Sequence, residues 1–242
     1  MRKEDNLLSI NKAAGLLGVS IDTLRRWDKK GKLKAVRSSG GHRYYSEEQL
    51  ENFVLDVKAI ARVWAESQAA PELSADYYCQ TQDIFKARLD RIAIEFEQNP
   101  AVKNLVSLII AVAGEIGNNS FDHNFGNWPD VPGIFFACDA NKRIIVLADR
   151  GVGIKSTLSR IRPNLKDDKE SLLTAFTERI SGRSPEQRGN GLKFVNNIAT
   201  ENPIGVSLQS GLAVAEIARQ NGRLRINLTD KHIRGVLAVI TY

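Results

Sequence analysis

Two short helices are expected near the start of the chain, because apolar residues recur there at helical spacing between helix-capping residues. Ser9 is placed to cap the first helix, Gly18 to end it, and Ser20 to cap the second. Two helices joined by a tight Gly-Val-Ser turn form a helix-turn-helix. The predicted apolar faces consist of Ile10, Ala13, Ala14 and Leu17 in the first helix, and Ile21, Leu24 and Trp27 in the second.

A β-hairpin is predicted directly after the second helix. The short segments KLKAV and HRYY are separated by Arg37-Ser-Ser-Gly-Gly41, which is typical of a glycine turn between paired strands. We expect this hairpin to form a basic wing beside the second helix.

A further helix is predicted after the wing, beginning at a capping box made by Ser46 and Gln49. Its apolar residues repeat at alternating spacings of three and four, at Leu50, Phe53, Val57, Ile60 and Trp64. This stripe fits either a homodimer interface or packing onto the chain's own core, and two heptads do not separate these alternatives. Residues 65–82 lose the pattern and contain Pro71, so we expect a linker there.

Residues 83–242 are predicted to form a second domain of helices and strands. One long helical pattern begins near Asp83 and another follows Pro100. A buried strand is expected at 143–148, and four more strands at 204–209, 212–218, 223–228 and 235–241. The predicted fold class is therefore α+β.

Positive charge is concentrated in the first part of the chain. The net charge is +6; residues 1–60 carry 12 lysine and arginine residues against 8 acidic ones, and the remainder carries 22 against 20. Between Arg25 and Arg43, eight basic residues accompany one acidic residue, Asp28. A stretch of this kind is either a solvated basic surface or a nucleic-acid interface.

Composition argues against several other classes of protein. The longest nearly apolar run, residues 105–113, is too short to cross a bilayer, and the first ten residues lack the pattern of a signal peptide. Cys79 and Cys138 are far apart without a CxxC pattern, which argues against a zinc site or a disulfide scaffold. We therefore expect a cytoplasmic protein with no membrane partner.

The order of the N-terminal features resembles the winged helix-turn-helix of the MerR and excisionase families. The resemblance covers about residues 7–53 and rests on SINKAAGLLGVSIDTLRRWDKKGKL followed by GGHRYYSEEQL. It implies binding to double-stranded DNA, with the second helix in a major groove and the wing on phosphates. The DNA-contacting residues that it implies are Thr23, Arg25, Arg26, Lys29, Arg37, His42 and Arg43.

A polar cluster ends the second helical pattern of the larger domain. Glu115, Asn119 and His123 are spaced four residues apart, so all three project from one helical face. A carboxylate, an amide and an imidazole in this arrangement suit either a site that holds a metal and positions water or a solvent-facing stripe.

Two glycine motifs follow this cluster. The strand at 143–148 leads into Asp149-Arg-Gly-Val-Gly153, and Arg188-Gly-Asn-Gly-Leu192 comes later. The string GVGIKST is not a P-loop, because Ile154 stands where that motif needs glycine. Ser156 likewise breaks a dinucleotide-binding fingerprint.

In this order, the motifs Glu-x-x-x-Asn, Asp-x-Gly-x-Gly and Gly-x-Gly-Leu resemble those of the GHKL ATPase superfamily, which includes gyrase, Hsp90, MutL, sensor histidine kinases and anti-sigma kinases. The resemblance runs from about residue 83 to 242 and implies a two-layer α/β sandwich that binds ATP and Mg²⁺ between helices and a lid. It implies that Asn119 holds Mg²⁺ and that Asp149 accepts a hydrogen bond from the adenine amino group. The other nucleotide-binding residues that it implies are His123, Gly151, Gly153, Gly189, Gly191 and Leu192.

The resemblance also implies a catalytic role for Glu115. A glutamate at this position is the general base in gyrase, MutL and anti-sigma kinases, whereas sensor histidine kinases usually have asparagine there. Glu115 thus favours hydrolysis, or transfer to a hydroxyl group, over transfer to histidine. None of the three histidines lies in a phosphoacceptor box, so a histidine kinase is not expected. One departure is Gly235-Val236, where several relatives have Gly-Thr.

The sequence therefore predicts a DNA-binding domain in residues 1–64 and an ATP-binding domain in residues 83–242, joined by a linker at 65–82. The leading hypothesis is a regulator in which Mg-ATP binding, with or without slow hydrolysis, modulates binding to DNA or to a protein partner. One alternative is a serine/threonine protein kinase like the anti-sigma kinases, tethered to DNA and acting on a co-encoded protein. Another is a DNA-processing ATPase of a repair or mobile-element system.

Overall fold

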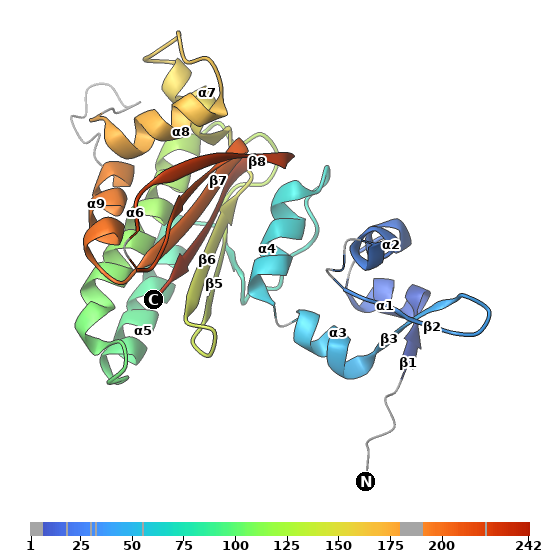
Figure 1. The fold of residues 1–242 in the computed structure, drawn as a ribbon. Helices are drawn as coiled ribbons and strands as arrows, with labels where there is room; N and C mark the ends of the chain where they lie inside the picture. The colour runs from blue at the N-terminus through green and yellow to red at the C-terminus, as the bar shows by residue number, and fades with distance from the viewer. Residues whose placement is uncertain are drawn as a thin grey trace. The chain divides into compact units, whose positions relative to one another are not determined.

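The computed structural model describes residues 7–17, 19–29, 31, 33–54, 56–179, 191–220 and 222–242. The chain divides into two compact units, Met1–Ile60 (unit 1) and Ala61–Tyr242 (unit 2), whose elements are labelled in Figure 1. Both units combine helices with an antiparallel sheet, in agreement with the predicted α+β class. Within the described ranges, no helix combines the length and the apolar character that a membrane span requires.

Unit 1 contains the predicted helix-turn-helix, formed by α1 (Ile10–Leu16) and α2 (Ile21–Lys29). The predicted wing is formed by β2 (Val36–Arg37) and β3 (Arg43–Ser46). A third strand that the sequence did not predict, β1 (Leu7–Ser9), pairs with the other edge of β3 and completes the order β1-β3-β2. The core of this unit includes Ala13, Ala14, Leu24, Trp27, Leu33, Tyr45 and Leu50.

The single helix predicted after the wing is wrong, because the chain forms two helices there, α3 (Glu47–Val54) and α4 (Val57–Glu66). Asp56 starts the second helix: its Oδ1 accepts a hydrogen bond from the Lys58 amide at 3.1 Å, which is the action of an N-cap residue. Three of the stripe residues are buried within the single chain, which fits the alternative of packing onto the chain's own core: Leu50, Val57 and Trp64.

The sheet of unit 2 has five antiparallel strands in the order β4-β5-β6-β8-β7. Its strands are β4 (Tyr78–Cys79), β5 (Ile134–Asp139), β6 (Ile144–Asp149), β7 (Gly205–Ile217) and β8 (Arg225–Thr241). The buried strand predicted at 143–148 corresponds to β6. The boundary between the units lies within α4, so the residues predicted as a linker contribute to unit 2, including edge strand β4.

The four strands predicted between residues 204 and 241 are wrong as separate elements, since β7 and β8 form one long hairpin. The pairing shifts register between Ser210 and Gly211 and again between Gly211 and Ala213. Gly211 has a φ of +60°, a backbone conformation that glycine adopts without strain. This β-bulge lets both strands continue through polar positions that looked like strand ends in the sequence.

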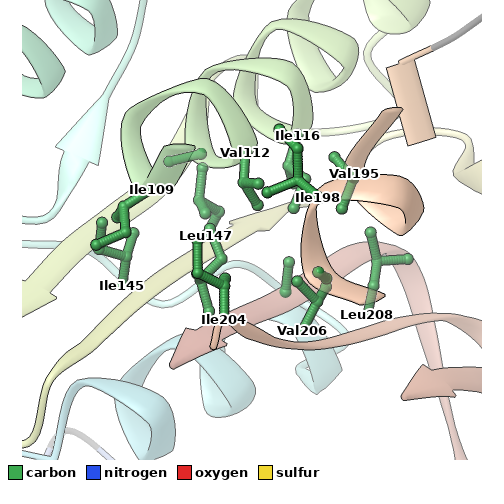
Figure 2. Packing of buried hydrophobic residues seen from close by; sticks show 14 of the residues in the cluster. Ile109, Val112, Ile116, Ile145, Leu147, Val195, Ile198, Ile204, Val206 and Leu208 are labelled. Carbon is green, nitrogen blue, oxygen red and sulfur yellow. The ribbon is translucent and has the colours of Figure 1, made fainter. Parts of the chain in front are cut away.

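Helices cover one face of this sheet, as Figure 1 shows for α5, α6 and α9. The main core lies between the two layers, and Figure 2 shows side chains of α6, β6, α9 and β7 meeting there. The helices of unit 2 beyond α4 are α5 (Gln82–Glu97), η1 (Lys103–Leu105), α6 (Val106–Asn124), α7 (Gly153–Ser159), α8 (Asp168–Thr177) and α9 (Gly191–Glu201). In this two-layer arrangement, the predicted nucleotide motifs lie toward the C-terminal ends of α6 and β6 and at the start of α9.

Candidate functional site

The exposed face of α2 carries three of the residues predicted to contact DNA. Ser20 caps this helix as predicted, since its Oγ accepts a hydrogen bond from the Thr23 amide at 3.1 Å. Thr23 itself is half-buried, whereas Arg25, Arg26 and Lys29 are exposed. The cap and the buried apolar face thus orient the basic side chains of α2 toward solvent, where they can meet phosphates or base edges.

Asp28, near the end of α2, holds the wing. Its Oδ2 accepts hydrogen bonds from Arg43 at 2.6 Å and from Arg37 at 2.9 Å, and its Oδ1 accepts one from the Ala35 amide at 3.1 Å. The hydrogen bonds from Arg43 and Ala35 lower the pKa of Asp28. The Arg43 side chain is 24% exposed, against 52% for Arg37. The ion pair of Arg43 with Asp28 is therefore mainly structural. His42 is exposed in the turn of the wing.

In unit 2, the start of α9 lies against the polar face of α6. Glu115 and Asn119 are half-buried, one turn apart. A methyl group added at Gly191 would lie 2.9 Å from Asn119 Nδ2 and 2.9 Å from Glu115 Oε2. The structure thus brings these three predicted residues together, and a larger residue at position 191 would displace the ends of the Glu115 and Asn119 side chains.

The remaining residues of that prediction are less closely grouped. His123 is half-buried one turn beyond Asn119 on α6. Leu192 packs against the main core cluster. Gly189 lies outside the described residues.

Asp149 ends β6 with its carboxylate buried, since the residue is 1% exposed. Its Oδ2 accepts a hydrogen bond from Ser120 Oγ at 2.7 Å, and its Oδ1 accepts one from the Gly151 amide at 2.8 Å. Burial raises the pKa of Asp149 to about 6, although the hydrogen bonds from Ser120 and the backbone act in the opposite direction. A carboxylate fixed in this way keeps lone pairs for one more donor.

Three glycines allow the backbone to approach this carboxylate and its neighbours closely. A methyl group at Gly235 would lie 2.1 Å from Asp149 Oδ1, and one at Gly151 would lie 2.1 Å from Asn124 Nδ2. Gly153 has a φ of +79°, which favours glycine for conformational reasons as well. Side chains at these positions would displace the polar groups that surround Asp149.

Several residues of this cluster were missed by sequence reasoning. Asn124 Oδ1 accepts a hydrogen bond from the Val152 amide at 2.8 Å, and Ser210 Oγ accepts one from the Ile154 amide at 3.0 Å. Ser120 and Asn124 are four residues apart and form a second polar row beside Glu115, Asn119 and His123, which is a signal that the sequence offered. Ser210 gave no such signal, because only strand pairing brings it to the loop after β6.

The side chains at the α6–α9 contact fit Mg²⁺ as part of its coordination. Asn119 supplies an amide oxygen, a hard ligand of the kind that Mg²⁺ prefers, and the Glu115 carboxylate lies one turn before it on α6. Within the described ranges, no group of three or more His, Cys, Asp or Glu side chains could hold a metal ion. A magnesium ion here would therefore take most of its ligands from phosphate groups and water.

Two comparisons with known proteins found similarity over part of the chain. Residues 9–45 match the family described as MerR family regulatory protein. Over 54 residues, 22% of this chain, the sequence is also 48% identical to the type II methyltransferase M.Eco47II of Escherichia coli. That stretch is 12% of the methyltransferase, so the chain spans about an eighth of that relative's length. The chain carries an N-terminal MerR family helix-turn-helix domain in residues 9–45, which contain α1, α2, β2 and most of β3.

Proposed function

We propose that the protein binds duplex DNA through unit 1 and Mg-ATP through unit 2, and that nucleotide binding regulates its binding to DNA or to a protein partner. The DNA-binding regulatory role is supported by the MerR family domain. The exposed side chains of Arg25, Arg26 and Lys29 on α2 supply the positive charge that such an interface needs.

The observation that carries the ATP proposal is the buried carboxylate of Asp149. An adenine presents an exocyclic amino group as a donor, whereas guanine presents a carbonyl oxygen at the equivalent position. A buried acceptor fixed by Ser120 and the Gly151 amide discriminates between them, because a carbonyl oxygen placed against it would leave both groups unpaired. The resemblance of the ordered motifs to the GHKL superfamily supports the same ligand.

The residues on α6 and α9 suit the phosphate end of that ligand. Asn119 would hold Mg²⁺ through its amide oxygen, and the ion would neutralise phosphate charge. Glu115, one turn before it on the same helix, would accept a proton from water or from a substrate hydroxyl group. The amides at the start of α9, from Gly191 onward, would donate to phosphate oxygens.

Calorimetric titration of the full chain with ATP and with GTP, each with Mg²⁺, tests this proposal. ATP should bind measurably and GTP at least tenfold more weakly. Asp149→Asn should weaken ATP binding by about 10-fold to 100-fold, the effect of a lost hydrogen bond to a charged group. Asp139→Asn, a control in the β5–β6 hairpin, should leave binding unchanged. The absence of ATP binding by the wild-type chain, or equal binding of GTP, would contradict the proposal.

The fate of the γ-phosphate distinguishes the regulator from its alternatives. With labelled ATP, a regulator releases free phosphate slowly or shows no turnover. Label on a serine or threonine of a co-encoded protein would instead identify a kinase, and ATP-dependent changes to DNA strands would identify a DNA-processing enzyme.

A further inference from the structure

Residues next to the nucleotide motifs hold the end of α4. Successive residues of a strand point to opposite faces of the sheet, so a residue that faces the cluster around Asp149 has a chain neighbour directed to the reverse face; Arg150 directly follows β6. This occurs at three pairs of consecutive residues. In each pair, one residue belongs to the cluster around Asp149. The other belongs to a polar network that contacts residues 62–68. These pairs are Asp149 and Arg150, Ser210 and Gln209, and Gly235 and Arg234.

Arg150 makes the main contact. Its side chain is 0% exposed. It donates to the carbonyl oxygens of Trp64, of Ser67 at 2.9 Å and of Gln68 at 3.2 Å, and it pairs with Asp130 at 2.6 Å. The guanidinium carbon also lies 5.8 Å from the centre of the Trp64 ring. Carbonyl groups at the end of a helix lack helical partners, so a cation there satisfies them and complements the helix dipole.

A second set of contacts ties the same end of α4 to β7 and β8. Gln209 Oε1 accepts a hydrogen bond from Arg62 at 3.3 Å, and Gln209 Nε2 donates to the Lys231 carbonyl at 2.6 Å. Lys231 Nζ pairs with Glu66 at 3.0 Å, and Arg62 pairs with Glu66 at 3.0 Å. All these residues belong to unit 2.

We propose that the nucleotide site regulates the hold of unit 2 on the end of α4, with Arg150 as the positioning residue. The inference rests on the proposed ATP site. Arg150 lies between Asp149 and Gly151 in the chain. A nucleotide that contacts Asp149 and the following glycines fixes the backbone of this segment. It thereby favours the state in which Arg150 binds the three carbonyl groups. Because α4 runs from Val57 to Glu66 across the boundary between the units, this hold acts on the covalent connection between them.

Hydrogen exchange of the full chain, with and without Mg²⁺ and a non-hydrolysable ATP analogue, tests the inference. Bound analogue should slow exchange at residues 149–158 and, by at least threefold, at residues 61–68. Protection of 149–158 with unchanged or faster exchange at 61–68 would overturn the inference and leave the ATP site standing. No protection at either segment would instead contradict the ATP site itself.

Two variants test whether the polar network transmits the effect. Arg150→Lys keeps the charge but loses the planar fork that reaches several acceptors, so nucleotide should still protect 149–158 but no longer slow exchange at 61–68. Arg150 is fully buried, so its substitution can also disturb the fold. Lys231→Gln is a milder change, because it removes the ion pair of a partly exposed side chain with Glu66. It should at least halve the slowing of exchange at 61–68. Lys142→Gln, which breaks the ion pair with Asp139 in the β5–β6 hairpin, should leave the slowing intact. Undiminished slowing in both Arg150→Lys and Lys231→Gln would overturn the inference.

Discussion

Replacing Asp149 with asparagine tests whether burial raises the pKa of this carboxylate and thereby makes the stability of the protein depend on pH. Its pKa of about 6 lies above the ordinary value of 3.8, because burial disfavours the charged form. The folded protein therefore binds this proton more tightly than the unfolded chain does. Consequently, the contribution of Asp149 to the free energy of unfolding is fully present below pH 3.8 and is lost as the pH rises through about 6.

The size of the effect follows from the two pKa values. At about 1.4 kcal/mol per pKa unit, a rise from 3.8 to about 6 corresponds to about 3 kcal/mol. Asparagine has no charge to bury; its Oδ1 can accept from the Gly151 amide and its Nδ2 can donate to Ser120 Oγ. Between about pH 4 and pH 7, the stability difference between Asp149→Asn and wild type should therefore shift by about 3 kcal/mol in favour of the variant.

Urea unfolding at a series of pH values measures this difference. In a Trp27→Phe background the fluorescence comes from Trp64 and Trp128, which both lie in unit 2. Asp139→Asn makes the same chemical change in the β5–β6 hairpin and serves as the control. A difference between Asp149→Asn and wild type that is independent of pH, or no larger than in the control, would refute the argument from burial.

Three other substitutions have effects that the contacts predict. Gly117→Ala should lower the free energy of unfolding by about 1–3 kcal/mol in urea titrations, since its methyl group would lie 2.2 Å from Phe85 Cζ; Gly114→Ala, with its nearest atom at 3.5 Å, should not destabilise the protein. Glu115→Ala should abolish ATP turnover and leave nucleotide affinity within about threefold; unchanged turnover would rule out Glu115 as the base. Arg26→Ala should reduce the salt dependence of duplex binding by about 0.9 in log–log slope, the value for one lost phosphate contact; an unchanged slope would place Arg26 away from phosphates.

The helix-turn-helix was predictable because local signals decide it. Ser20 caps α2, and Leu24 and Trp27 of its predicted apolar face are buried, whereas Ile21 is half-buried. The strand β1 was missed, since three residues show no pattern until they pair with β3. The break between α3 and α4 was also missed, although Asp56 is a residue that competes with helix backbone.

The candidate nucleotide site was predictable only as an ordered set of motifs. The rows on α6 could be read from spacing, because residues four apart share a helical face. The hydrogen bond of Ser210 to the Ile154 amide and the approach of Gly235 to Asp149 depend on how β6, β7 and β8 pair. No local pattern contains that information.

The sequence by itself determined the helix-turn-helix, the basic face of α2 and the positions of the polar and glycine motifs, since periodicity and capping act over a few residues. Only the tertiary structure decided what surrounds each charge. It paired both wing arginines with Asp28, buried the Asp149 carboxylate beside Ser120, and set Arg150 against the end of α4. Desolvation and ion pairing depend on atoms from distant segments, so they arise only when the sheet and its helices have packed.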